Sequence, residues 1–211
     1  AADYLLEAFD NERAVRLLRR RLELSDDYDL GARRDLVRGL LRVGAWDESL
    51  GILNECIPLF EQAPDRCSAQ DAVDCYTELG DLLIKRGEKA QGLEVVDKGI
   101  AVAAANGYDI GLVRLYRDKG YSAFFDKDYE KALGYYDKAI EHARASGVEE
   151  MVARVRNNIG LVYSKTGRHD EALEAFEATL DLARRTHKYE GVSSALNNIG
   201  YLYNEMGRYE D

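Results

Sequence analysis

Apolar residues along this chain recur at intervals of three or four positions within successive segments, and short polar stretches separate those segments. This spacing puts the apolar side chains on one face of an α-helix. The two clearest segments run from about Glu149 to Thr166 and from about Asp170 to His187. Gly167 is expected to stop the first helix, and the Asp170 side chain is expected to cap the start of the second. The pattern therefore predicts a pair of helices joined by a tight turn.

A 40-residue period repeats this pair along the chain. Glycines stand 40 residues apart at Gly80, Gly120, Gly160 and Gly200. A second series follows seven residues later at Gly87, Gly167 and Gly207, with Lys127 in the remaining unit. Small residues come twelve positions after the first series, and larger apolar residues come four positions further on: Gly92, Ala132, Ala172, then Val96, Tyr136, Phe176. The period predicts repeated helix pairs that stack on one another.

The first glycine series predicts where the two helices of a pair cross. A glycine inside a helix costs about 1 kcal/mol relative to alanine, so its recurrence at one phase needs a packing reason. We expect Gly160 and Ala172 to remove side-chain bulk at the crossing, with Tyr163 and Phe176 filling the space beside them. The same reasoning excludes a phosphate-binding loop, because these glycines lie inside predicted helices.

The repeated residues resemble the tetratricopeptide repeat. The matching positions are Ile159-Gly160, Tyr163, Ala172 and Phe176, and then Ile199-Gly200 and Tyr203. The usual closing proline is absent, which fits a second helix that continues into a longer repeat. Such repeats are similar to those of kinesin light chain, Pins-type polarity proteins and bacterial regulatory arrays. The resemblance implies an all-α, right-handed superhelical solenoid of antiparallel helix pairs, with about five repeats.

The quality of the repeats divides the chain. Residues 1–62 are expected to form degenerate repeats, and residues 67–211 regular 40-residue repeats, the last one truncated, within a single continuous solenoid. The irregular segment Gln62–Arg66 bounds the poorer part. The chain starts near the end of a first helix and stops at Asp211, before a second helix would begin. We therefore expect a fragment of a longer protein.

The composition agrees with an all-α chain and indicates in which cellular compartment the protein is found. The 211 residues include only 2 prolines, 46% are apolar, and the formal net charge is -10. No apolar run approaches the roughly 18 residues of a transmembrane helix, and no secretory signal pattern is visible. The three cysteines, without a CxxC pair, favour reduced thiols. These features predict a cytoplasmic protein without a membrane partner.

The resemblance also indicates a ligand surface, because first helices line the concave groove in this family. The stripe beside the packing stripe gives the predicted groove residues: Arg114, Arg117, Tyr121, Arg154, Asn157, Asn158, Leu161, Lys165, Asn197, Asn198 and Tyr201. Asparagine amides both donate and accept hydrogen bonds, so they can hold a peptide backbone. The alternative is that one asparagine of each pair bonds the neighbouring repeat and only stiffens the stack. Aromatic residues such as Tyr121 and Tyr201 either form an apolar floor for a ligand or pack between helices.

A basic segment interrupts the acidic chain. From Arg13 to Arg42 there are nine arginines and five acidic residues, a net charge of +4. Arg34, Arg38 and Arg42 are therefore a candidate pocket for an acidic motif. A solvated helix face is the alternative. Nucleic acid is not expected as a partner, because the overall charge repels phosphate and no basic stripe continues along the array.

Catalytic motifs are absent from the sequence. It contains no H-E-x-x-H, G-x-S-x-G or P-loop pattern, so we predict no enzyme activity, no metal site and no cofactor. The function favoured by the sequence is a scaffold that binds a peptide or protein segment in its groove. The alternatives are a sensor or dimerisation segment of a larger signalling or transcription regulator, and a self-assembly module that forms homo-oligomers through its terminal repeats.

Overall fold

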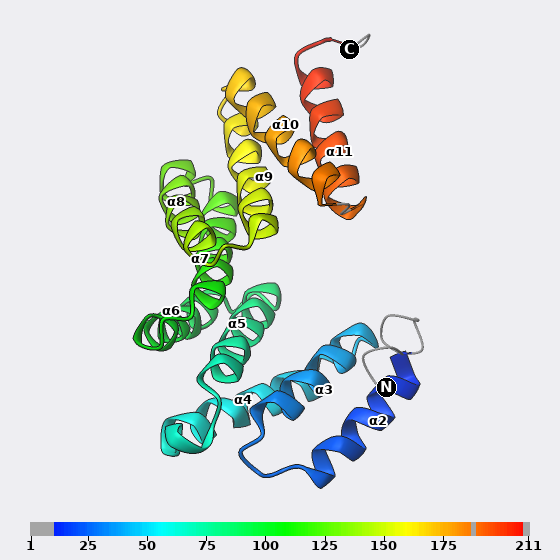
Figure 1. The fold of residues 1–211 in the computed structure, drawn as a ribbon, viewed down its shortest axis with the longest axis vertical. Coiled ribbons are helices and arrows are strands. Elements are labelled where there is room, and N and C mark those ends of the chain that lie inside the picture. The colour runs from blue at the N-terminus through cyan, green and yellow to red at the C-terminus, as the bar shows by residue number, and fades with distance from the viewer. Residues whose placement is uncertain (1–10, 187–188, 209–211) are drawn as a thin grey trace. The chain divides into compact units, whose positions relative to one another are not determined.

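The computed structural model describes residues 11–186 and 189–208, and every regular element in this part of the chain is helical. The α-helices are α2 (Asn11–Leu24), α3 (Leu30–Arg42), α4 (Trp46–Gln62), α5 (Ala69–Lys85), α6 (Lys89–Ala105), α7 (Asp109–Phe125), α8 (Tyr129–Ala145), α9 (Glu149–Lys165), α10 (His169–Arg185) and α11 (Tyr189–Glu205) (Figure 1). A 3₁₀ helix, η1 (Pro64–Arg66), joins α4 to α5 within the irregular segment. The all-α helical repeat fold predicted from the sequence is confirmed.

The 40-residue period arises from the lengths of the helices and their links. Each helix from α5 to α11 has 17 residues. The links between them have three residues, so one helix pair with its two links spans 40 residues. Neighbouring helices run antiparallel, as α9 and α10 show clearly (Figure 1).

Positive φ angles in the links explain the second glycine series. Gly87 and Gly167 have φ angles of 87° and 75°, a left-handed conformation that glycine adopts without steric cost. At the end of α9 the Gly167 N–H donates to Ser164 O (3.1 Å), and the Arg168 N–H donates to Tyr163 O (2.9 Å). These bonds satisfy the last carbonyls of the helix. Lys127 takes the same conformation, with φ 61°.

Three glycines of the first series, Gly80, Gly120 and Gly160, mark helix crossings as predicted, whereas nothing lies within 4 Å of a Cβ atom at Gly200. A Cβ atom at Gly160 would lie 2.6 Å from the Phe176 ring, and one at Gly120 would lie 2.4 Å from the Tyr136 ring. Phe176 and Tyr136 are each 1% exposed, so neither ring has room to withdraw. Only glycine fits at these crossings, because real Cβ atoms do not approach other atoms so closely.

The predicted capping role of Asp170 is wrong. Helix α10 begins at His169, and Arg168 is the N-cap residue, without a side-chain capping bond. Because Gly167 already reverses the chain, the helix and its N-cap come two residues earlier than the capping preference of Asp170 suggests. Asp170 therefore lies in the first turn, where a negative charge is still favourable near the helix N-terminus. The predicted helix end at His187 lies outside the described residues.

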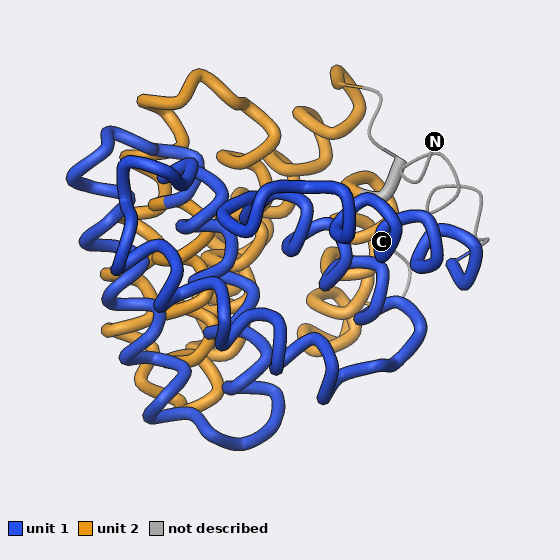
Figure 2. The backbone as a smooth tube through the Cα atoms, turned by 90° about the horizontal axis from the view of Figure 1, so that it is seen from below, with its two compact units in different colours: residues 1–111 blue, residues 112–211 orange. Residues whose placement is uncertain are grey.

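Two compact units divide the chain, residues 1–111 and 112–211, and each is described separately (Figure 2). In the first unit, α2 packs on α3 through buried residues that include Ala14, Leu18 and Leu36. A second cluster joins α3, α4 and α5. Its members include Cys56 and Cys75, both 0% exposed and both free thiols.

The second unit contains the helices on which the predicted groove residues lie. Val113 of α7, Tyr136 of α8 and Val155 of α9 belong to one buried cluster. Phe176 of α10 and Leu202 of α11 belong to the next one. Burial of these side chains fixes the rotation of α9 and α11, and so determines which residues of each helix meet solvent.

Candidate functional site

Two asparagines join the predicted groove faces of α9 and α11. Asn198 Nδ2 donates to Asn157 Oδ1 at 2.8 Å. The first asparagine of one repeat thus meets the second asparagine of the next. Asn157 and Asn198 are both partly exposed, so the bonded pair remains accessible to solvent. Neither Asn158 nor Asn197 has a hydrogen-bond partner for its side chain within the described residues, and Asn197 is exposed.

A second set of contacts joins the same helices about two turns further on. Lys165 Nζ lies 3.1 Å from Tyr201 Oη and 3.4 Å from Glu205 Oε1. Ser164 Oγ donates to Glu205 Oε2 at 2.8 Å. The hydrogen bond with Tyr201, together with Glu205, raises the pKa of Lys165 above its ordinary value. The lysine therefore stays charged over the whole neutral range.

The Glu205 carboxyl shows the opposite shift. Its partial burial alone would raise its pKa, but hydrogen bonds with Ser164, Tyr201 and Lys165 lower it below the ordinary value. Ser164 itself is a buried residue that the groove stripe did not include. The only sequence signal for this contact was a serine within a helix, next to the predicted groove residue Lys165.

Two further cations among the predicted groove residues have acidic neighbours. Arg154 Nη2 donates to Glu150 Oε1 at 2.7 Å, and Arg117 Nη2 donates to Asp118 Oδ1 at 3.0 Å. Arg114 is partly exposed on α7 and also takes part in an interaction. The Arg154 pair is largely exposed, so solvent screens it.

Apolar groove residues divide into exposed and packed ones. Tyr121 is 53% exposed, and its ring meets the edge of Phe125, which is 63% exposed, at a centroid distance of 4.6 Å. Tyr201 is 50% exposed. Leu161, in contrast, packs against the buried cluster of Ala172, Phe176 and Leu202. The exposed aromatic rings among the predicted groove residues therefore come from α7 and α11.

The three arginines predicted as an acidic-motif pocket do not share one environment. Arg34 Nη1 forms ion pairs with Asp71 (2.6 Å) and Asp74 (2.9 Å) of α5, and Nη2 pairs with Asp35 (3.2 Å). Burial alone would lower the pKa of Arg34, but these carboxylates raise it. Arg38 and Arg42 are exposed further along α3. The guanidinium group that was predicted to bind an external acidic motif is therefore already paired with carboxylates of this chain at Arg34.

Within the described residues, no group of three His, Cys, Asp or Glu side chains is arranged to hold a metal ion. No described helix is long and apolar enough to cross a membrane.

Comparison with known proteins identifies the class of fold. Residues 151–211 match the family model of the tetratricopeptide repeat. A search of curated protein sequences found no significant match. Tetratricopeptide repeats form an interaction fold that is generally not catalytic.

Solved structures with this fold cover nearly the whole chain. BtubC (BKLC) from P. vanneervenii is 20% identical, with a TM-score of 0.75, over 100% of this chain and 86% of that protein. Putative kinesin light chain TPR-like repeats from Podosopora anserina are 14% identical, with a TM-score of 0.64, over 89% and 93%. The Rap conjugation gene regulator of plasmid pLS20, in complex with the Phr* peptide, is 14% identical, with a TM-score of 0.74, over 97% and 61%.

These matches confirm the resemblance stated from the sequence. The chain has the TPR-like repeat fold, and its similar structures include kinesin light chain-like repeats. A fold of this class is typical of protein–protein interaction scaffolds.

Proposed function

We propose that the groove residues of α7, α9 and α11 bind an extended peptide or an extended segment of a partner protein. The bonded pair Asn157–Asn198 carries this proposal. An asparagine amide has two donor hydrogens and one acceptor oxygen with two lone pairs. The mutual bond uses one donor of Asn198 and one lone pair of Asn157. Asn157 Nδ2 and Asn198 Oδ1 remain to pair with the C=O and N–H groups of a peptide backbone.

Charged and aromatic neighbours define the side chains that such a peptide would carry. Arg154 and Lys165 lie on α9 on either side of Asn157. Exposed ion pairs contribute little to stability, so exchanging Glu150 for a ligand carboxylate at Arg154 costs little. Tyr121 and Tyr201 offer exposed rings to apolar side chains. We therefore propose a ligand segment that mixes acidic and apolar residues.

The Rap regulator supports the proposal, because it has a similar fold and its structure is that of a complex with the Phr* peptide. The two sequences are only 14% identical, so contact residues of the Rap regulator are not assigned to this chain. The proposed contacts rest on the asparagine pair Asn157–Asn198.

Selection of random peptides displayed on phage, followed by fluorescence anisotropy with each selected peptide, tests the proposal. Asn197 is exposed and has no side-chain hydrogen bond to a described residue. Asn197→Ala should therefore weaken peptide binding about fivefold by removing one hydrogen bond, without lowering the urea midpoint. Asn157→Ala should weaken binding further and also lower the midpoint, because it removes the bond to Asn198 as well.

Asn54→Ala is the matched control, since Asn54 is an exposed asparagine of α4, outside the groove. It should leave peptide affinity unchanged. Selected peptides that bind Asn197→Ala and Asn157→Ala as tightly as the unchanged protein would contradict the proposal and leave the asparagines a purely structural role.

A sensor role within a larger regulator is the second candidate. The observation that favours it is the match of 97% of this chain to 61% of a conjugation gene regulator. If the role is correct, a selected peptide should change the mass or shape of the full-length protein in light scattering. An unchanged profile at peptide saturation would argue against it.

A further inference from the structure

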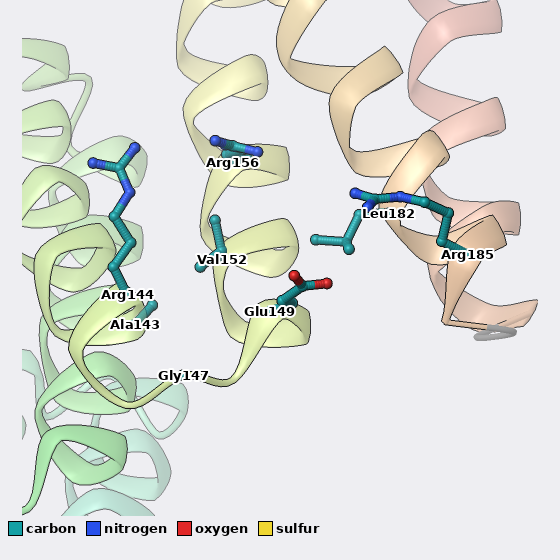
Figure 3. A pocket seen from close by; sticks show the side chains of 8 residues that line it. All are labelled: Ala143, Arg144, Gly147, Glu149, Val152, Arg156, Leu182 and Arg185. Carbon is teal, nitrogen blue, oxygen red and sulfur yellow. The ribbon is translucent and has the colours of Figure 1, made fainter.

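A pocket of about 400 Å³ lies in the second unit, where the ends of α8 and α10 meet the start of α9 (Figure 3). Its volume falls in the range of small-molecule sites. The residues that line it are Ala143, Arg144, Gly147, Glu149, Val152, Arg156, Leu182 and Arg185. Figure 3 shows the side chains of Arg156, Leu182 and Arg185 around the space between α9 and α10, with Arg144 on the α8 side.

Three guanidinium groups and one carboxylate determine the charge of this pocket. Within the described residues, Arg144, Arg156 and Glu149 have no ion-pair partner. Arg185 pairs with Asp181 at 3.1 Å, but their side chains are 63% and 69% exposed. Water screens such a pair, and a ligand anion can replace it at small cost. The pocket therefore has an excess of two positive charges in a chain whose net charge is -10.

Apolar side chains cover the base of the pocket. Ala143 is 0% exposed and Leu182 is 5% exposed, because both belong to the buried core, and Val152 beside them is half-buried. A ligand with an apolar body next to its charged group would contact these side chains. The combination of cations around an apolar base is the usual composition of a site for a small organic anion.

The pocket is separate from the proposed peptide groove. On α9 its residues Glu149, Val152 and Arg156 follow helical spacing and share one face. The groove residue Arg154 lies two positions from both Val152 and Arg156. At about 100° per residue, its side chain leaves the helix about half a turn away from theirs. Occupation of one site therefore does not require the other.

We propose that this pocket binds a small organic phosphate monoester. A phosphate monoester carries about -1.5 to -2 charges at pH 7. This charge matches the two excess positive charges of the pocket better than the charge of a single carboxylate does. Guanidinium groups bind phosphate oxygens in a bidentate manner. Arg156 and Arg185 hold the phosphate between α9 and α10, Arg144 adds a third positive charge, and the organic part rests on Val152 and Leu182.

Calorimetric titration of the whole chain with phenyl phosphate, at constant ionic strength, tests the proposal. Inorganic phosphate is a probe that lacks the apolar body, and benzoate is a probe that lacks the second negative charge. Phenyl phosphate should bind more tightly than either. Equal affinity for inorganic phosphate would overturn the role of the apolar base, and equal affinity for benzoate would overturn the preference for phosphate. Absence of phenyl phosphate binding would overturn the site itself.

Charge variants locate the binding. Arg156→Gln and Arg185→Gln should each weaken phenyl phosphate binding about tenfold, because each removes charge-assisted hydrogen bonds. Glu149→Gln should strengthen it by removing the repelling carboxylate. Arg184→Gln is the matched control, since Arg184 is exposed on α10 and lies outside the pocket. Affinity that falls equally in Arg184→Gln would overturn the assignment, with circular dichroism showing that each variant is folded.

Discussion

A single residue, Lys127, shows what the link between two helices demands of the backbone. Among the described residues it alone has a positive φ angle without being glycine, at 61°. It follows α7, and its N–H donates to Phe124 O at 2.9 Å. The Cβ atom makes this left-handed conformation costly by roughly 1 kcal/mol or more for an L-residue. Lys127 therefore carries backbone strain that Gly87 and Gly167 avoid in the equivalent links.

We predict that Lys127→Gly raises the free energy of unfolding by about 0.5–1 kcal/mol. Removing the Cβ atom relieves the strain, and the greater freedom of glycine in the unfolded chain offsets part of the gain. Urea denaturation measures the change. Lys131→Gly makes the same substitution inside α8 and should instead lower stability by about 1 kcal/mol. Similar losses in both variants would show that the left-handed link is not strained.

Residue pairing also marks the limit of what the sequence could predict for the site. The asparagine doublets were visible in the sequence, and their two competing roles were stated. The observed bond joins Asn157 to Asn198, which is 41 residues away and so one residue beyond the 40-residue period. That offset depends on how far α11 is shifted along α9, which sequence spacing alone does not contain.

At the scale of elements, the helices were predictable because glycine marks both their crossings and their ends. Gly160 excludes any side chain against Phe176, and Gly167 reverses the chain after α9. The start of α10 was predicted less well, because the capping preference of Asp170 is weaker than the turn geometry set by Gly167. The sequence analysis missed the pocket proposed to bind a phosphate monoester, since Arg144, Arg156 and Arg185 come from three helices and form no sequence motif.

The contact between α9 and α11 should depend on pH through Glu205. Its folded-state pKa is lowered, so its contribution to stability is present above the unfolded value of about 4.3 and is lost as pH falls through the lower folded value. Protonation weakens the bonds with Ser164 and Lys165. We therefore predict that amide hydrogen exchange in α11 speeds up below about pH 4, beyond the intrinsic change.

Glu205→Gln is the control for this pH effect, because its amide has no charge to lose. The variant should show faster exchange in α11 already at neutral pH and little further change on acidification. If its acid response equals that of the unchanged protein, Glu205 is not the titrating group.

For the whole molecule, the repeat fold predicts that stability is local. Each helix pair contacts only its neighbours, so stability is close to a sum of repeat and interface contributions. The uneven charge of the chain has the same local character. The arginines between Arg13 and Arg42 suggested a binding site for an acidic motif of another molecule. Arg34 instead pairs with Asp71 and Asp74, which lie 37 and 40 residues further along the chain. Charge counted along the sequence does not reveal such partners.

Arg34→Gln tests this locality. The substitution takes a cation away from Asp71 and Asp74, and Asp74 is only 8% exposed. Loss of one partner from such a cluster should cost about 2–3 kcal/mol, because the carboxylates keep their desolvation penalty. Hydrogen exchange with mass spectrometry should then show lost protection in α3 and α5, while α9 and α10 keep theirs.

Arg20→Gln provides the comparison, since Arg20 pairs with Glu23 in a bridge whose side chains are 67% and 62% exposed. It should change stability by no more than about 0.5 kcal/mol. If Arg34→Gln reduces protection equally in α3, α5, α9 and α10, the chain unfolds as one cooperative body, and nearest-neighbour stability does not describe it. If Arg20→Gln costs as much as Arg34→Gln, the cluster around Arg34 has no special role, and burial of its carboxylates is not the cause of the loss.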